Sequence, residues 1–196
     1  MKILILASQS PSRKKILKDA NIVFKAVASN YKEDMTLNQP PEELAIYLSA
    51  GKAREVAARV KNSLVIGADS FVVFEGKVIG KPHTNVRARD VLKMLSGKRH
   101  DLITGFTIID TETGVSYSDC IVTKVYFRDL NNRDIENYIR TDNVLEKAGA
   151  YSFQGNGYKL IEKVDGDLSN FEGLPLNAVI KALKRFGYKI GNFRPT

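Results

Sequence analysis

The chain opens with a strand that passes almost directly into a helix, and this order constrains the fold more than any other feature. Residues 3–6 are an apolar run typical of a short buried strand. Ser10 is a good N-cap for the following helix, and Pro11 suits its first position, where a missing N–H costs nothing. Free N–H groups at a helix start attract anions, so this serine-rich turn, followed by Arg13, predicts a phosphate cradle. An ordinary capped helix is the alternative.

Short apolar runs alternate with amphipathic segments along the rest of the chain, which indicates a mixed α/β architecture. Residues 111–114 separate two long β-type runs and predict an antiparallel hairpin. Strands are expected near residues 2–7, 22–28, 64–74, 100–110, 115–127 and 158–164, and helices near residues 11–20, 41–60, 84–95, 131–141 and 175–187.

Composition limits the classes of protein to consider. The 196 residues, 43% of them hydrophobic and 27% charged, are typical of a globular protein of one domain or one two-lobed unit. No apolar run is long enough for a membrane span, and no signal-peptide pattern is present. The single cysteine, Cys120, excludes an internal disulfide and favours the reducing cytoplasm. A net charge of +8 favours a polyanionic partner, either a nucleotide or a nucleic acid.

Asp69 lies near the middle of the apolar run at residues 64–74. Such a continuous run predicts a strand that is buried on both faces. A carboxylate there needs an ion pair, hydrogen bonds or a metal, because an isolated buried charge is very unfavourable. A break in the strand, with Asp69 capping a turn, is the alternative. Gly67 precedes it and apolar residues resume directly afterwards, which favours a functional carboxylate.

Lys52 is a second anomaly, on the helix expected at residues 41–60. The other residues in its row, spaced four apart, are all apolar: Leu44, Leu48, Val56 and Val60. A lysine in this row either extends along the apolar surface to solvent or reaches a buried anion. The sequence leaves both possibilities open.

Two further charged residues are expected in loops. Lys81 stands before Pro82, which restricts it to an extended conformation. The Glu33 carboxylate could join Asp69 as a hard oxygen ligand for Mg²⁺ or Mn²⁺. Each of these residues is also an ordinary surface charge when considered alone, so neither defines a site by itself.

Taken in order, these segments resemble the Maf family of nucleoside triphosphate pyrophosphatases. Members open with Leu-Ala-Ser-x-Ser-Pro-Arg-Arg and later carry Lys-Ala, Gly-Ala-Asp-Thr, Lys-Pro, Leu-Ser-Gly-x-x-His, Lys-Ala-Gly-Ala-Tyr with Gln-Gly, and Gly-Leu-Pro-Leu. The matching segments lie at residues 6–13, 52–53, 67–70, 81–82, 95–100, 147–155 and 173–176. Each motif is common by itself, but the ordered set is highly specific.

The resemblance implies one domain over residues 1–196, with an elongated, two-lobed α/β fold. Its central twisted mixed sheet would be flanked by helices, as in inosine triphosphatases. It also implies hydrolysis of a nucleoside triphosphate to the monophosphate and pyrophosphate, with Mg²⁺ or Mn²⁺ as cofactor. The implied site residues are Asp69 as proton acceptor, Ser8, Ser10, Arg13, Lys52 and Lys81 for the phosphates, Glu33 and Asp69 for the metal, and Ser12, Ser70 and Gln154 for the base.

The base preference is mixed. Gln154 agrees with members that prefer dTTP and UTP, but Ser12 and Ser70 stand where those members have arginine and threonine. A relaxed, pyrimidine-leaning enzyme is therefore expected, and a pyrophosphatase for methylated guanosine triphosphate is the alternative.

A non-enzymatic role in binding nucleic acid or inhibiting septum formation is a further alternative. No nucleic-acid recognition motif is present, so a stable complex with nucleic acid is not expected. No membrane partner is expected, and a homodimer stays open.

Overall fold

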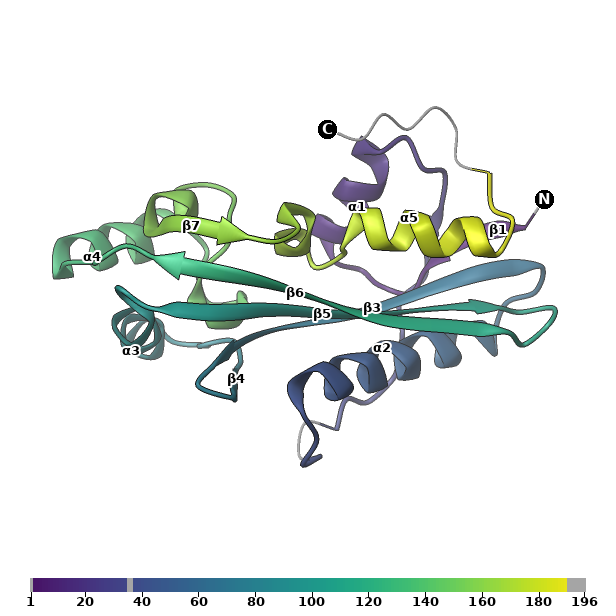
Figure 1. The fold of residues 1–196 in the computed structure, drawn as a ribbon, viewed down its shortest axis with the longest axis horizontal. Helices are drawn as coiled ribbons and strands as arrows, with labels where there is room; N and C mark the ends of the chain where they lie inside the picture. Colours follow the sequence, from purple (N-terminus) through teal and green to yellow (C-terminus); the bar gives the residue numbers. More distant parts are fainter. Residues whose placement is uncertain (1, 35–36, 190–196) are drawn as a thin grey trace. The chain divides into compact units, whose positions relative to one another are not determined.

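The computed structural model describes residues 2–34 and 37–189 of the chain (Figure 1). The helices are α1 (Pro11–Asp19), α2 (Pro41–Ala57), α3 (Asn85–Leu95), α4 (Asn132–Thr141) and α5 (Leu176–Arg185). The strands are β1 (Ile3–Leu6), β2 (Lys25–Ala26), β3 (Ser63–Phe74), β4 (Lys77–Ile79), β5 (Arg99–Asp110), β6 (Ser116–Phe127) and β7 (Ile161–Asp165). Three short 3₁₀ helices are η1 (Ala148–Ala150), η2 (Gly157–Leu160) and η3 (Leu168–Glu172).

The strands form one mixed sheet in the order β2-β1-β3-β5-β6-β7, and β4 pairs with β3. The β1 strand is parallel to β2 and β3, whereas β4 and β7 are antiparallel to their neighbours. The Asp110 N–H donates to the Val115 carbonyl at 2.9 Å and closes the turn between β5 and β6. These pairings confirm the predicted mixed α/β class and the hairpin.

The structure differs from the sequence expectations mainly in short elements. The strand expected at residues 22–28 is reduced to the two residues of β2. The β4 strand was not predicted, although its signal is in the sequence. Glu75 and Gly76 both have positive φ, 49° and 74°, and make the two-residue turn that antiparallel hairpins favour. Glycine after a polar residue, between two apolar runs, is the signal that identifies such a turn.

The chain divides into two compact units. Unit 1 comprises Met1–Asp69, Thr104–Ile121 and Glu172–Thr196, and unit 2 comprises Ser70–Ile103 and Val122–Phe171. Each of β3, β5 and β6 therefore contributes residues to both units. The expectation of a single domain with two lobes stays a prediction.

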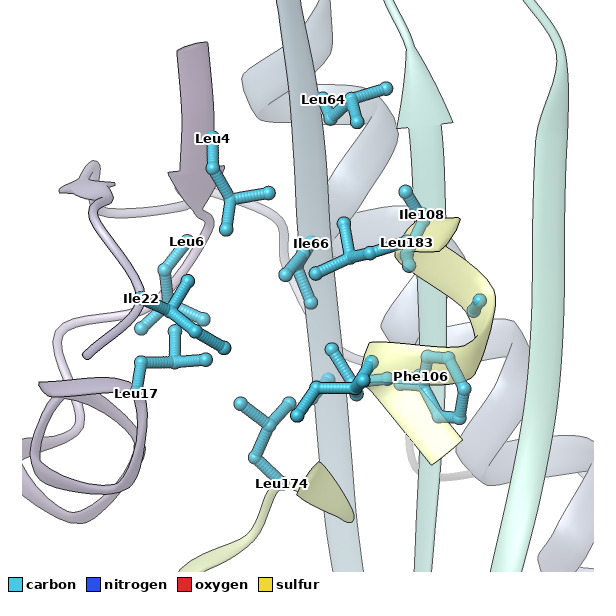
Figure 2. Packing of buried hydrophobic residues seen from close by; sticks show 14 of the residues in the cluster. Leu4, Leu6, Leu17, Ile22, Leu64, Ile66, Phe106, Ile108, Leu174 and Leu183 are labelled. Atoms are coloured by element: carbon cyan, nitrogen blue, oxygen red, sulfur yellow. The ribbon is translucent and has the colours of Figure 1, made fainter. Parts of the chain in front are cut away.

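In unit 1, alternate strand residues face opposite sides of the sheet. Leu4 and Ile66 belong to a core that α1 and α5 cover, with Leu17 and Leu183 packed against the strands (Figure 2). Their neighbours face the other side, where Val65 packs with residues of α2. Both faces of β3 are thus buried, and this accounts for the continuous apolar run at residues 64–74.

Two glycines bring α2 unusually close to the sheet. A Cβ atom added to Gly67 on β3 would lie 2.3 Å from the Ser49 carbonyl oxygen, and one added to Gly105 on β5 would lie 2.3 Å from the Ala45 carbonyl carbon. Only residues without a side chain allow this approach. The contact fixes α2 against the same face of β3 that Gly67 and Asp69 share.

Unit 2 has its own core, in which α3 and α4 contribute Leu92 and Ile135, and the strands contribute Val72 and Phe127. The amphipathic α4 begins with a capping box, since the Asn131 side chain and the Asp134 side chain bond each other's backbone N–H groups. No helix within residues 2–34 and 37–189 is both long and apolar enough to cross a membrane.

Candidate functional site

The turn between β1 and α1 has the capped geometry that its sequence predicts. The Ser10 hydroxyl accepts from the Arg13 N–H at 3.4 Å, and Pro11 occupies the start of α1. The Ser8 hydroxyl accepts from the Ser10 N–H at 3.1 Å and from Nη1 of Arg13 at 3.4 Å. This turn therefore brings Ser8, Ser10 and Arg13 together at a helix N-terminus.

Asp69 lies inside an unbroken strand. The β3 strand runs through this position, so the alternative of a turn capped by Asp69 is wrong. The residue is 7% exposed and points to the α2 face of the sheet, because residues two apart on a strand share a face and Asp69 therefore lies on the same face as Val65 and Gly67. A carboxylate is thereby held at a fixed depth on a rigid element.

Lys52 of α2 supplies the cation that this carboxylate needs. Its Nζ atom donates to Oδ1 of Asp69 and lies 2.8 Å from Oε1 of Glu33, while the Lys52 side chain is only 13% exposed. The lysine therefore reaches a buried anion and does not extend to solvent. This reach is short because α2 approaches β3 closely at Gly67, where a Cβ atom would lie 2.7 Å from the backbone nitrogen of Ala53, the residue next to Lys52.

Several contacts that the sequence did not reveal anchor the segment carrying Glu33 to α2. The ring of Tyr31 occupies the space above Gly51, 2.3 Å from where a Cβ atom would be. The Asn30 N–H donates to the Glu55 carboxylate at 2.9 Å, and the Arg59 guanidinium donates to the Ala28 carbonyl at 2.8 Å. Glu55 and Arg59 are spaced by four in the helix expected at residues 41–60, and this was the available signal, although α2 ends at Ala57.

Arg13 is the second cation of unit 1 that affects Asp69. Its Nε atom donates to the Gly173 carbonyl at 2.7 Å, which ties α1 to the loop before α5. Burial raises the pKa of the Asp69 carboxyl, while the charges of Lys52 and Arg13 lower it and Glu33 raises it further. Burial lowers the pKa of the Arg13 guanidinium, against the attraction of Asp69 and Glu33, but an arginine keeps its charge.

Lys81 belongs to unit 2, where it pairs with an acid that the sequence did not single out. Its Nζ lies 3.0 Å from Oε2 of Glu146, and both side chains are more than half exposed. Backbone bonds join the two loops, since the Gly149 N–H donates to the Gly80 carbonyl at 3.2 Å. Glu146 directly precedes the Lys-Ala-Gly-Ala-Tyr motif, which was the only signal for it.

The residues expected to select the base are also distributed between the units. Ser12 is half-buried on α1 in unit 1, whereas Ser70 is half-buried on β3 in unit 2. Gln154 is exposed in a loop of unit 2, where its backbone carbonyl accepts from the Ser152 hydroxyl at 3.3 Å. Their proposed roles in substrate selection stay predictions.

Glu33 and Asp69 are the acidic residues of unit 1 that are expected to bind the metal. Glu33 and Asp69 both present oxygens to the same Lys52 ammonium, so two hard ligands lie close together. Among the residues that the structure describes, no group of three or more His, Cys, Asp or Glu side chains is placed to hold an ion. Two carboxylates fit Mg²⁺ or Mn²⁺ when substrate phosphates and water complete the coordination.

Comparison with known structures first identifies the class of fold. The Staphylococcus aureus Ham1 protein matches with a TM-score of 0.53 at 15% sequence identity, over 94% of this chain and 97% of that one. At this identity the likeness concerns the fold alone, and it agrees with the expected mixed sheet flanked by helices.

Comparison of sequences then identifies the family. The family model described as Maf-like protein matches residues 3–186. A dTTP/UTP pyrophosphatase of Geotalea uraniireducens (strain Rf4) is 40% identical over 184 residues, 94% of this chain and 95% of the relative. One from Methanosarcina barkeri (strain Fusaro / DSM 804) is 41% identical over 191 residues, 97% of each chain. The chain belongs to the Maf family, which confirms the resemblance.

Proposed function

We propose that this chain is a nucleoside triphosphate pyrophosphatase, which hydrolyses the bond between the α and β phosphates and releases pyrophosphate. The observation that carries this proposal is the cluster of Asp69, Lys52 and Glu33 in a chain of the Maf family. The relatives named dTTP/UTP pyrophosphatase support both the activity and a preference for pyrimidine nucleotides.

The chemistry needs a base and stabilisation of negative charge. In the proposed reaction a water oxygen attacks the α phosphorus. The bond between this phosphorus and the oxygen that bridges to the β phosphate breaks, and pyrophosphate leaves. An oxygen of the Asp69 carboxylate accepts the proton of the attacking water. The buried strand that holds Asp69 fixes the direction in which that proton is accepted.

The cations of unit 1 supply the charge stabilisation. Lys52 and Arg13 carry positive charge close to Asp69, and partial burial weakens the screening of that charge by water. The Ser8 and Ser10 hydroxyls, together with the N–H groups that begin α1, provide further donors for phosphate oxygens. Lys81 is proposed from its motif as an additional phosphate contact.

Glu33 and Asp69 are proposed to hold the divalent cation that the family resemblance implies. When bound, Mg²⁺ or Mn²⁺ would neutralise part of the charge on the phosphate oxygens. Lys52 already holds both carboxylates together in this structure, so little rearrangement of the chain is needed to present them.

The base is proposed to be selected by Gln154, whose amide offers both a donor and an acceptor to a pyrimidine edge. Ser12 and Ser70 would make this selection relaxed, because serine is smaller than the arginine or threonine expected there. A cytoplasmic location, motivated by the single cysteine, stays a prediction. A homodimer and the absence of a stable nucleic-acid complex also stay predictions.

The test measures pyrophosphate and monophosphate from dTTP, UTP, the other common triphosphates and methylated guanosine triphosphate. The expected result is one pyrophosphate for each monophosphate, with dTTP and UTP preferred. Replacing Asp69 by asparagine keeps the shape but removes the charge, and it should lower kcat by about 10²-fold or more. Asp19→Asn, which removes an exposed carboxylate from unit 1, is the matched control and should leave kcat unchanged.

Two outcomes would contradict the proposal separately. Release of orthophosphate in place of pyrophosphate would show that another bond is cleaved. Near-normal turnover by a folded Asp69→Asn protein would remove Asp69 from the mechanism while leaving the activity itself in place.

A further inference from the structure

A buried histidine in unit 2 takes no part in the proposed chemistry. His100, on β5, is 2% exposed, and its Nε2 lies 2.8 Å from the Tyr151 hydroxyl. Its ring meets Phe127 edge to face, with centroids 4.8 Å apart. Within residues 2–34 and 37–189, Nδ1 of His100 has no hydrogen-bond partner.

The surroundings keep this imidazole neutral. Burial lowers the pKa of His100 to about 4, so the ring carries no charge near neutral pH. A neutral ring has one donor and one acceptor nitrogen, so either tautomer leaves Nδ1 unsatisfied, at a cost in stability. Phenylalanine would fill the same space without that cost. The hydrogen bond to Tyr151 is therefore what histidine adds at this position.

Tyr151 begins the loop that carries Gln154. Its side chain is buried, and its ring packs 4.8 Å from the ring of Phe127. Its ring also contacts that of Phe171, which in turn packs 5.0 Å from the ring of Phe153, the neighbour of Gln154. Packed aromatic rings thus connect Tyr151 to the residue before Gln154, so a shift of the Tyr151 ring would change the packing of Phe153.

The remainder of the loop is held at other points, which leaves Gln154 between fixed anchors. The Ser152 N–H donates to the Tyr138 hydroxyl at 3.1 Å. The Asn156 N–H donates to the Asp142 carboxylate at 3.0 Å. A Cβ atom on Gly157 would lie 1.7 Å from the Ser152 carbonyl oxygen, so the loop closes tightly on itself.

We propose that His100 is a positioning residue for base selection, acting through its hydrogen bond to Tyr151 to fix the loop that carries Gln154. This inference rests on the proposed function, in which Gln154 contacts the base. It assigns His100 a role in discrimination among triphosphates and none in cleavage of the phosphate bond.

The experiment compares His100→Phe, Tyr151→Phe and the double variant. The readout is the ratio of kcat/KM for dTTP to that for dGTP, with Tm measured in parallel. Each single variant loses the same hydrogen bond and should lower the ratio by about threefold to tenfold, and the double variant by no more than either one. The activity with dGTP should stay within about twofold of the wild type, because the phosphate-binding residues are unchanged.

Ser96→Ala is the matched control in unit 2. It removes the hydrogen bond that the Ser96 hydroxyl accepts from the Leu130 N–H at 2.8 Å. It should lower Tm without changing the ratio, as a purely structural loss would. If His100→Phe does not fold, Tyr151→Phe removes the same bond by deleting a single oxygen and answers the same question.

An unchanged ratio in the folded variants, or a double variant with additive losses, would overturn the role of His100. A wild-type protein that releases pyrophosphate equally from dTTP and dGTP would overturn it as well. A wild-type protein that releases no pyrophosphate from any triphosphate would instead overturn the proposed function.

Discussion

The two lysines expected to contact phosphate lie in contrasting surroundings. In unit 1, the Lys52 side chain is 13% exposed and contacts the buried Asp69. In unit 2, the Lys81 side chain is 51% exposed, and that of its partner Glu146 is 62% exposed. Charges in the first environment are weakly screened, whereas water and salt screen those in the second.

This difference in exposure predicts different roles for the two lysines. The charge of Lys52 lowers the pKa of Asp69 and so favours the ionised form of the proposed base. Lys52 is also proposed to contact a phosphate. Lys81 touches a surface acid whose own pKa it lowers, so its charge is available mainly for binding. We therefore expect Lys52 to affect the chemical step and Lys81 to affect substrate affinity.

The largest expected effect separates these two lysines directly. Lys52→Met removes the charge and keeps most of the side-chain length, and it should lower kcat by about 10²-fold or more. Lys81→Met should raise KM and change kcat by less than about tenfold, because its exposed ammonium is already screened. Steady-state kinetics with dTTP measures both parameters.

Lys184→Met is the control for this comparison, since it removes one exposed charge of α5 from unit 1. It should leave kcat/KM nearly unchanged. Equal small losses in all three variants would mean that positive charge acts only as a diffuse field, and the distinction between buried and exposed lysines would fail.

The second effect is a change in pH dependence. Asp69 must be ionised to act as a base, so kcat/KM should fall as the pH drops through its raised pKa. Removing Lys52 removes a charge that lowers this pKa, so the acid limb of the profile should move to higher pH in Lys52→Met. The limb should stay in place in Lys81→Met. A shift to lower pH in Lys52→Met would contradict the proposed electrostatics.

Local features of the site were predictable because they depend on neighbours in sequence. The Ser10 cap and the turn after β5 follow from residue types within a few positions. Asp69 and Lys52 were identifiable as charges in apolar surroundings. Their position near each other was not, because it depends on the packing of α2 against β3 at Gly67.

Partners far apart in the sequence were harder to predict. Lys81 and Glu146 are 65 residues apart, and each reads as an ordinary surface charge. In the sequence, His100 is identifiable only as the last residue of the Leu-Ser-Gly-x-x-His motif. Its burial and its hydrogen bond to Tyr151 were not predictable, because both depend on the folded core of unit 2. Tertiary packing, which no local pattern encodes, decides such contacts.

The smallest expected effect concerns Ser12, where the chain departs from its family. An arginine there restores a planar donor group beside Arg13, and Ser12→Arg should raise the preference for dTTP and UTP over purine triphosphates by about fivefold. Ser12→Lys adds the same charge without the planar donors and should give a smaller gain. Both variants place a cation at the start of α1, which should lower Tm slightly by the same amount. Measuring kcat/KM across the triphosphates therefore separates the effect of hydrogen bonding from the effect of charge.

A wild-type preference for methylated guanosine triphosphate, or an equal gain in both variants, would contradict this account of Ser12, whereas the contrast between Lys52 and Lys81 would stand.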